Sequence, residues 1–194
     1  MIRRLRAALL LAMLAGAEAA LATPKAPAAS ASELPLQCFV AAGQRYRIDP
    51  MLLYAIAEVE SNLVPSAINR NRNGSIDYGV MQINSLHLSK LKSVGIDERR
   101  LLDEPCVAVH VGASILAELI SRHGYTWAAV GAYNAGSSAT RGAARHAYAT
   151  KVWASYAAMI SARESATQGA VRSSDRRKKK GNATMIRKGL RDRA

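Results

Sequence analysis

Residues 49–61 read DPMLLYAIAEVES, and this stretch has the features of an amphipathic helix. Asp49 is a typical N-cap residue, and Pro50 suits the first helical position because its ring presets the φ angle that a helix needs. At about 100° per residue, several apolar side chains fall on one face of such a helix. They are Leu52, Leu53, Ile56, Val59 and Leu63. The stretch therefore predicts a helix with one side packed in a core.

Glu60 lies inside that apolar face, whereas Glu58 lies nearly opposite and is expected to face water. A carboxyl group on a buried face loses hydration, which raises its pKa by disfavouring the charged form. An acid that is still protonated near neutral pH can serve as a general acid in catalysis. A buried glutamate that is paired with an arginine, or capped by backbone amides, would give the same pattern. Periodicity alone leaves both interpretations open.

Residues 69–85, NRNRNGSIDYGVMQINS, are rich in amide side chains and contain a strong turn signal. Asn73-Gly74 favours a two-residue hairpin turn because both residues tolerate positive φ. The stretch predicts a small antiparallel hairpin with Asp77 on its second arm, and a simple polar loop is the alternative. Polar side chains beside a candidate acid favour a sugar-binding cleft, where hydroxyl and acetamide groups need hydrogen-bond partners.

The remaining pattern is helical. Apolar residues recur at helical spacing over 106–123 and stop before Gly124, a typical C-terminal cap. Thr126 is expected to cap a short helix that runs into AYNAG at 132–136, and a last helix covers about residues 146–162. Four or more helices around one small antiparallel β-hairpin predict an α+β fold that is mostly α-helical.

The composition fits a single domain, because 194 residues with 49% hydrophobic content can bury a sizeable core. Residues 1–22 combine a basic start, a short apolar run and a small-residue cleavage site. This pattern is typical of a signal peptide, with an uncleaved anchor helix as the alternative. The predicted organisation continues with a linker over 23–35, a domain over 36–162 and a basic tail over 163–194.

Most of the net charge of +13 lies in this tail, which has eleven Lys and Arg residues against three acidic ones. The tail is expected to be disordered and solvated, and able to contact anionic polymers or a membrane surface. A nucleic-acid-binding arm would look similar but conflicts with an exported leader. Export also bears on Cys38 and Cys106, since an even pair in an oxidising compartment predicts one disulfide. The four histidines show no close spacing with the cysteines, so no metal site is expected.

Four short motifs, in order along the chain, resemble those of the lysozyme-like superfamily and, within it, of the soluble lytic transglycosylase domain. They are Glu60-Ser61, GVMQIN at 79–84, AYNAG at 132–136, and Tyr148 followed by Lys151-Val152. Each motif is weak alone, but the four in order across about residues 36–160 are specific. The cysteine pair and residues 71–75 are most similar to the small transglycosylases that accompany type III and type IV secretion, conjugation and pilus machines.

The resemblance implies an enzyme that cleaves the bond between N-acetylmuramic acid and N-acetylglucosamine in peptidoglycan. Glu60 would protonate the glycosidic oxygen and then take the proton of the muramoyl 6-hydroxyl, which closes a 1,6-anhydro ring without water, metal or cofactor. Other motif residues would bind the substrate or position the acid. These are Ser61, Gln82 and Asn84 in the cleft, Tyr133 and Asn134 at the muramoyl acetamide, and Tyr148 against Glu60. The two tyrosines could instead be core aromatics with satisfied hydroxyl groups.

The implied partners are peptidoglycan glycan strands and a cell-envelope secretion, conjugation or pilus apparatus. The predicted signal peptide implies a periplasmic location and argues against a nucleic-acid partner, and a monomer is expected. A catalytically idle peptidoglycan-binding module is an alternative, and the intact Glu60 on an apolar face argues against it.

Asp77 complicates the reaction that the resemblance implies. The stretch from Glu60 to Ser85 is also similar to animal-type (c-type) lysozymes, which place a second carboxylate where Asp77 stands. If Asp77 faces Glu60, it could support hydrolysis with retention of configuration. The AYNAG loop and the late tyrosine are not lysozyme features. The lyase reaction is therefore favoured, with Asp77 as a substrate-binding residue.

Overall fold

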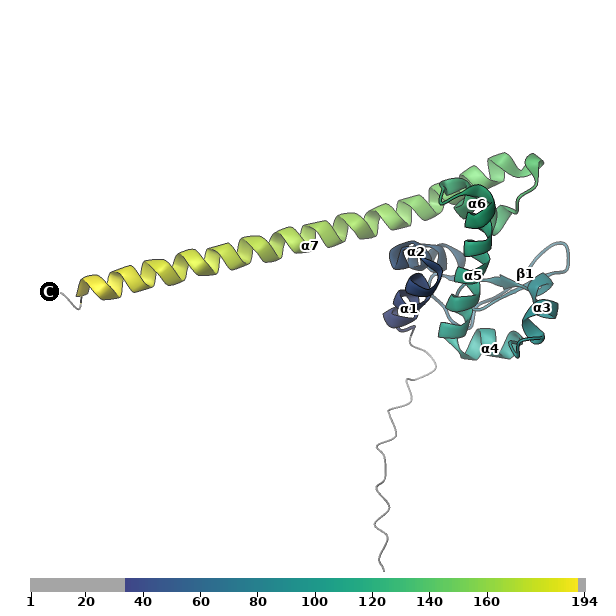
Figure 1. The fold of residues 1–194 in the computed structure, drawn as a ribbon, viewed down its shortest axis with the longest axis horizontal. Helices are drawn as coiled ribbons and strands as arrows, with labels where there is room; N and C mark the ends of the chain where they lie inside the picture. The colour runs from purple at the N-terminus through teal and green to yellow at the C-terminus, as the bar shows by residue number, and fades with distance from the viewer. Residues whose placement is uncertain (1–33, 192–194) are drawn as a thin grey trace, which may run out of the picture.

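The computed structural model describes residues 34–191, and beyond Ala170 it describes side chains only for Arg172. The predicted signal peptide, and all of the predicted linker except its last two residues, lie outside the described residues. In the described chain, most residues belong to helices, and a small sheet lies near the middle of the sequence (Figure 1). The predicted α+β class with mostly helical content is confirmed.

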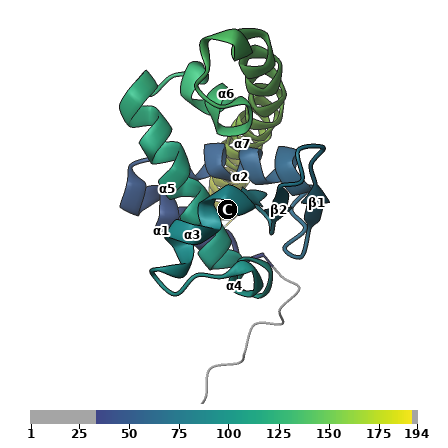
Figure 2. The same ribbon diagram turned by 90° about the vertical axis from the view of Figure 1, so that its right-hand side faces the viewer.

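The body of the described chain is built by longer helices around one sheet. The helices are α1 (Leu36–Tyr46), α2 (Pro50–Ser61), α5 (Pro105–His123), α6 (Trp127–Ala135) and α7 (Gly142–Arg191). The antiparallel sheet has the order β1 (Ile68–Arg70), β2 (Ile76–Tyr78), β3 (Ile83–Asn84). The connecting elements are η1 (Ser85–His87), α3 (Leu88–Lys92), α4 (Glu98–Asp103) and η2 (Ala139–Arg141). In Figures 1 and 2, α7 passes α6 and α2 and then leaves the domain as a single helix.

The start of α2 follows the sequence prediction. The Asp49 carboxylate accepts a hydrogen bond from Met51 N at 2.9 Å, and Pro50 opens the helix. Leu53 and Ile56 on the predicted apolar face are fully buried. The helix ends just after Glu60, where Asn62 takes a left-handed conformation with φ 52°. The predicted helix and its buried face are confirmed.

The other side of α2 differs from the prediction for Glu58. This residue is half-buried, and its carboxylate accepts a hydrogen bond from the Ser155 hydroxyl of α7. The expectation that Glu58 faces water is therefore wrong. The physical reason is that α7 packs against α2, so that α2 is covered on more of its circumference than its apolar stripe indicates.

The sheet differs from the prediction in its turn and in its extent. β1 and β2 are joined by a five-residue loop, 71–75, rather than by two residues. In this loop Gly74 has positive φ, at 84°, and Asn73 does not. The Asn73 side chain instead accepts hydrogen bonds from the backbone N–H and the hydroxyl of Ser75, which closes the loop in another way. β3 adds a third strand that the predicted hairpin lacked, while Asp77 lies on the second arm as expected.

The core gathers buried side chains from all parts of the domain. Its largest fully buried members are Phe39, Leu53, Ile56, Met81, Ile83, Leu101 and Leu116. Helix α5 is long and apolar enough to cross a membrane by length and composition, but it packs against α1, α4 and α6 as a core helix. Gly79 joins the sheet to this core, because a Cβ there would lie 2.2 Å from the Leu101 carbonyl oxygen, at a φ of +74°. Only glycine fits that position without moving backbone.

Helix α7 is longer than the sequence predicted. The pattern indicated a helix over about 146–162 and a disordered tail after it, whereas the helix runs from Gly142 to Arg191. Residues 142–191 contain no proline and many Ala, Lys and Arg residues, which have high helix propensity. Residues 163–170 are all exposed, as expected of a solvated segment. The domain boundary at 162 remains a prediction.

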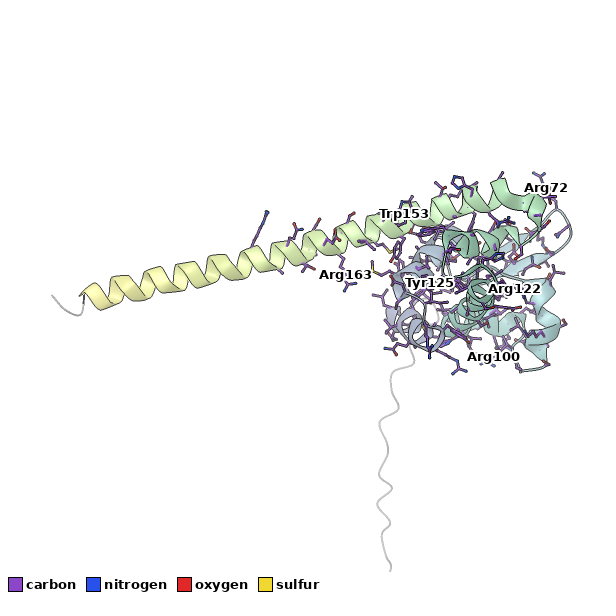
Figure 3. The ribbon with its side chains drawn as sticks, turned by 45° about the horizontal axis from the view of Figure 1, so that its top comes forward. Arg72, Arg100, Arg122, Tyr125, Trp153 and Arg163 are labelled. Carbon is purple, nitrogen blue, oxygen red and sulfur yellow. A yellow bond between two sulfur atoms is a disulfide. The ribbon has the colours of Figure 1, made fainter. Side chains whose placement is uncertain are left out.

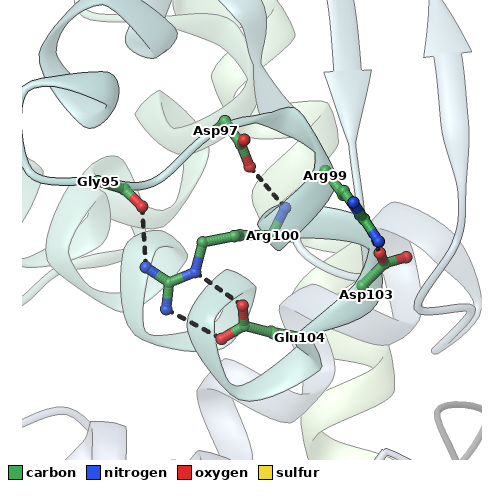
Figure 4. Close-up of polar contacts among 6 residues, drawn as sticks. All are labelled: Gly95, Asp97, Arg99, Arg100, Asp103 and Glu104. Carbon is green, nitrogen blue, oxygen red and sulfur yellow. Dashed lines mark hydrogen bonds and ion pairs between the residues drawn. The ribbon is translucent and has the colours of Figure 1, made fainter.

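A bidentate ion pair fixes the start of α5. Arg100 donates to both carboxylate oxygens of Glu104 at 2.7 and 2.9 Å, and to the Gly95 carbonyl at 2.9 Å (Figure 4). Asp97 caps α4 by accepting from Arg100 N at 2.9 Å. Exposed ion pairs stabilise a fold by at most about 1 kcal/mol. Here the contacts of Arg100 mainly hold Gly95, in the loop before α4, close to Glu104, which directly precedes α5.

Cys38 of α1 and Cys106 of α5 form the predicted disulfide, with their Cα atoms 4.9 Å apart. The bond closes a loop with a sequence separation of 68 residues. Restricting an unfolded chain by a loop of this length stabilises the fold by about 4 kcal/mol in the chain-entropy model.

We expect the double variant Cys38→Ala/Cys106→Ala to fold with a free energy of unfolding lower by up to about 4 kcal/mol, measured by urea denaturation. Intact mass should rise by two hydrogens when the unaltered protein is reduced. Equal urea midpoints for oxidised and reduced protein would contradict the assigned role of the bond.

Candidate functional site

The last turn of α2 places Glu60 against α7. The Tyr148 hydroxyl donates a hydrogen bond to Glu60 Oε1 at 2.6 Å, although the two residues are 88 positions apart in the sequence. Tyr148 is itself buried in the core. Among the residues that the structure describes, no ion pair involves Glu60. The alternative of a glutamate paired with an arginine is therefore not the arrangement observed.

The surroundings of Glu60 raise its pKa from the ordinary value of 4.5 to about 7. Burial of the carboxyl is the largest cause, and the negative charge of Asp77 adds to it. Hydrogen bonds from Tyr148 and Asn134 lower the pKa but do not offset burial. A group with this pKa is about half protonated at neutral pH, so it can both donate and accept a proton.

Asp77 is held by amide groups rather than by burial. Its Oδ2 accepts hydrogen bonds from Asn71 at 2.8 Å and from Asn69 at 3.3 Å, and its Oδ1 accepts from Asn84 at 2.7 Å. The register of the sheet explains the contacts, because Asp77 pairs with Asn69 on β1 and with Asn84 on β3. Three N–H donors aimed at one carboxylate fix its position.

Tyr133 links the AYNAG segment, which forms the end of α6 rather than a loop, to the GVMQIN stretch. Its hydroxyl donates to the Met81 carbonyl at 3.0 Å. Burial, with the charges of Glu60 and Asp77 as further causes, raises its pKa well above the usual value. Helix α5 leaves room for the hydroxyl only because residue 112 is glycine, since a Cβ there would lie 2.8 Å from it. Tyr133 therefore stays neutral and lies within the electrostatic reach of both acids.

The other predicted residues divide into two kinds. Ser61 donates to the Val80 carbonyl at 2.8 Å, and Gln82 donates to the Gly79 carbonyl at 2.9 Å, so both side chains brace the GVMQIN backbone. Asn134 is exposed and acts on the pKa of Glu60. The structure thus brings Asn134, Tyr148 and Asp77 to bear on Glu60, while the polar groups of Ser61 and Gln82 bond to backbone.

Sequence reasoning missed Asn69 and Asn71, which hold Asp77. Only part of the signal was present: Asn69 and Asn71 share a strand face, but the predicted two-residue turn would pair Asp77 with Arg70 on the other face, whereas the observed loop pairs it with Asn69. For metal binding, no group of three or more His, Cys, Asp or Glu side chains is found within the described part of the chain.

Comparisons with known proteins identify the family of the chain. The family described as Transglycosylase SLT domain matches residues 37–156. Invasion protein IagB of Salmonella typhimurium is 51% identical over 119 residues, which cover 61% of this chain and 74% of that protein. Protein IpgF of Shigella flexneri is 46% identical over 119 residues, covering 61% and 78%. A putative peptidoglycan-binding-like protein of Escherichia coli K12 is 46% identical over 121 residues, covering 59% and 77%.

Among solved structures, the fold is similar to that of an inactive mutant of the lytic transglycosylase Slt from Pseudomonas aeruginosa, with a TM-score of 0.53. The two sequences are 22% identical, and the match covers 67% of this chain. The chain spans 24% of that structure's length. At this identity the likeness concerns the fold alone.

The raised pKa of Glu60 predicts a pH-dependent effect of Glu60→Gln on stability. Between pH 4.5 and about 7 the folded protein keeps a proton that the unfolded chain has released, so the free energy of unfolding falls as pH rises through this window. Gln does not titrate. The free energy of unfolding of the variant, relative to that of the unaltered protein, should therefore rise by up to about 3 kcal/mol between pH 4 and pH 8, measured by urea unfolding. At pH 4 both side chains are neutral, which supplies the control, and a difference that stays constant with pH would contradict the burial.

Proposed function

Since the chain belongs to the transglycosylase SLT domain family, we propose that it is a lytic transglycosylase that cleaves peptidoglycan strands between N-acetylmuramic acid and N-acetylglucosamine. The observation that carries the proposal is the buried Glu60 carboxyl, with a pKa of about 7 and a hydrogen bond from Tyr148. The relative in Escherichia coli whose name describes it as peptidoglycan-binding-like supports the choice of substrate.

Glu60 serves the reaction twice. In the first step its protonated carboxyl gives a proton to the glycosidic oxygen, and the bond from that oxygen to C1 of the muramoyl ring breaks. In the second step the Glu60 carboxylate takes the proton of the muramoyl 6-hydroxyl, and the 6-oxygen bonds to C1. The products are a 1,6-anhydromuramoyl end and a free 4-hydroxyl, and no water is consumed. A pKa of about 7 suits a group that must be acid and then base at near-neutral pH.

Tyr148 and Asn134 position this carboxyl for both steps. Tyr148 fixes Oε1 by its hydrogen bond and stabilises the charged form after the first proton has left. Asn134, exposed and next to Glu60, is available to the acetamide of a muramoyl ring. Tyr133 holds the end of α6 against Met81 and so places Asn134.

The position of Asp77 favours a second candidate function, that of a retaining muramidase. Its carboxylate is fixed by three amides and raises the pKa of Glu60, as expected of two acids that share a cleft. In the lyase reaction the nucleophile is the substrate's own 6-hydroxyl, whose effective concentration exceeds that of water when it is well oriented. Asp77 then stabilises positive charge at C1 and binds substrate without attacking it.

The proposed place of action is the periplasm, reached by the predicted signal peptide. A role in opening the wall locally for a cell-envelope secretion, conjugation or pilus apparatus is supported by the relative named as an invasion protein. The basic segment beyond residue 162 carries eleven Lys and Arg residues, which suit contact with an anionic wall.

We expect Glu60→Gln to reduce the release of soluble muropeptides from purified sacculi at least about a hundredfold, because the amide keeps the shape but cannot deliver a proton. Glu58→Gln is the matched control on the same helix, since its amide oxygen can still accept the hydrogen bond from Ser155. Equal losses in the two variants would show that the position of Glu60 is not what matters.

Asp77→Asn separates the lyase from the muramidase. For the lyase, the rate should stay within about tenfold, and mass spectrometry should find 1,6-anhydromuropeptides from both proteins. The substitution leaves one amide of the sheet without its acceptor, which costs about 1–3 kcal/mol, so rates are compared at a temperature where both proteins are folded. Reducing muramic ends from the unaltered enzyme, with a collapse of rate in the variant, would favour the muramidase instead.

A further inference from the structure

A cluster of aromatic rings lies on α6 and α7, formed by side chains that belong to none of the four motifs. Trp127, Trp153 and Tyr156 form this aromatic patch, with ring centroids 5.2 Å apart for the two tryptophans and 6.2 Å from each of them to Tyr156. Trp153 is 51% exposed and Trp127 is 39% exposed. Figure 3 labels Trp153 on α7, with Tyr125 below it. Large rings left half in water gain free energy when a ligand covers them.

The patch is held rigid by the N-terminus of α2. The Tyr156 hydroxyl donates to the Asp49 carboxylate at 2.5 Å, and the Tyr125 hydroxyl accepts from Asp49 N at 3.0 Å. The other carboxylate oxygen of Asp49 caps α2 through Met51 N. A ligand that stacks on these rings does not have to order them first, which lowers the entropic cost of binding.

The patch is distinct from the candidate catalytic centre. Asp49 stands immediately before α2 and Glu60 lies in its last turn, eleven residues later. At 1.5 Å per residue, the two ends of the helix are about 16 Å apart. On α7, Trp153 follows Tyr148 by five residues, which is about 7.5 Å along the helix and about 140° around it. The rings therefore lie on another face than the tyrosine that bonds Glu60, and a polymer held there can still reach the acid.

The chemistry of the patch suits an uncharged, amphipathic ligand. A recess of about 110 Å³ opens beside the rings, several times the roughly 30 Å³ share of one water. Its walls are uncharged: Leu52, Ile120, Tyr125, Thr126, Trp127, Val130 and Tyr156. Within the described part of the chain, neither indole N–H of the patch donates a hydrogen bond, so both remain available to a ligand acceptor.

A pyranose ring with an N-acetyl group has matching features. Its C–H face is apolar and stacks on an indole, its hydroxyl and acetamide oxygens accept from indole N–H groups, and its acetyl methyl fits a small apolar recess. A charged peptide is a poorer match, because the Asp49 carboxylate beside the patch already has both oxygens in hydrogen bonds.

The geometry points to a second glycan-binding surface on the aromatic patch, which holds an N-acetylated sugar polymer apart from the catalytic carboxyl. This inference rests on the proposed function for the identity of the polymer, a peptidoglycan strand. The surface increases the time that the enzyme spends on polymeric substrate, while short glycans that reach only Glu60 do not use it.

The test measures binding without cleavage, in the Glu60→Gln background of the full chain. Sedimentation with purified sacculi and with chitin, a peptide-free polymer of N-acetylglucosamine, gives the two dissociation constants. Trp153→Ala should weaken both by about tenfold, which corresponds to about 1.4 kcal/mol. Trp153→Tyr, which keeps a stacking ring, should restore most of the affinity. With Glu60 intact, Trp153→Ala should leave the turnover of short soluble glycans unchanged.

Val94→Ala is the matched control, because Val94 is an apolar residue that is 67% exposed and lies outside the patch. Unchanged binding of both polymers by Trp153→Ala would overturn the inference. So would a loss on sacculi but not on chitin, which would assign the patch to stem peptides, or a shift from dimer to monomer in sedimentation velocity, which would assign it to a second copy of the chain. If the unaltered enzyme forms no anhydro products and Trp153→Ala still weakens binding, the proposed reaction fails and the glycan surface stands.

Discussion

The hydrogen bond from the Tyr148 hydroxyl to the Glu60 carboxyl joins α7 to the C-terminal end of α2. The carboxyl is largely buried there and has lost most of its hydrating water. Burial alone would push the pKa of Glu60 further up, and full solvation would leave it near 4.5. The hydroxyl of Tyr148 opposes burial, and the result lies near 7. The chemistry proposed for Glu60 depends on this balance, which in turn requires that α7 is packed on α2.

The two acids of the site have different surroundings, which suit different roles. Glu60 lies in a largely buried place and accepts hydrogen bonds from Tyr148 and Asn134, whereas Asp77 is held in a small sheet by three amides. The first arrangement favours a neutral acid, and the second fixes the position of a carboxylate. The negative charge of Asp77 in turn helps to keep Glu60 protonated. The sheet thus contributes to the acid on α2 without a hydrogen bond to it.

The sequence predicted those features that local rules determine. The cap at Asp49, the buried face of α2 and the raised pKa of Glu60 follow from helical spacing and from the cost of burying a charge. Features that depend on tertiary packing were missed. Glu58 looked exposed because nothing in its own helix shows that α7 covers it. The loop after β1 looked like a two-residue turn because the side chain of Asn73, which closes the loop differently, does not enter dipeptide rules.

The same limit applies to the aromatic patch. Trp127 and Trp153 meet only after α6 and α7 have packed, so no sequence window contains both rings. The amides that hold Asp77 were visible in the sequence as a polar cluster. That they point at Asp77 could not be predicted without the register of the sheet. Motif resemblance identified Tyr148 more directly than spacing did, since 88 residues separate it from Glu60.

The separation of 88 residues between Glu60 and Tyr148 has a consequence for synthesis and folding. A chain made from its N-terminus presents Glu60 long before Tyr148 exists, and α2 without α7 leaves the carboxyl in water as an ordinary, ionised acid. The proposed proton donor therefore forms when the late helix α7 docks, not when Glu60 is synthesised. In an incomplete or partly folded chain the Glu60 carboxyl is present but has lost its proton at neutral pH, so the proposed wall-cleaving activity begins only when the whole domain has folded.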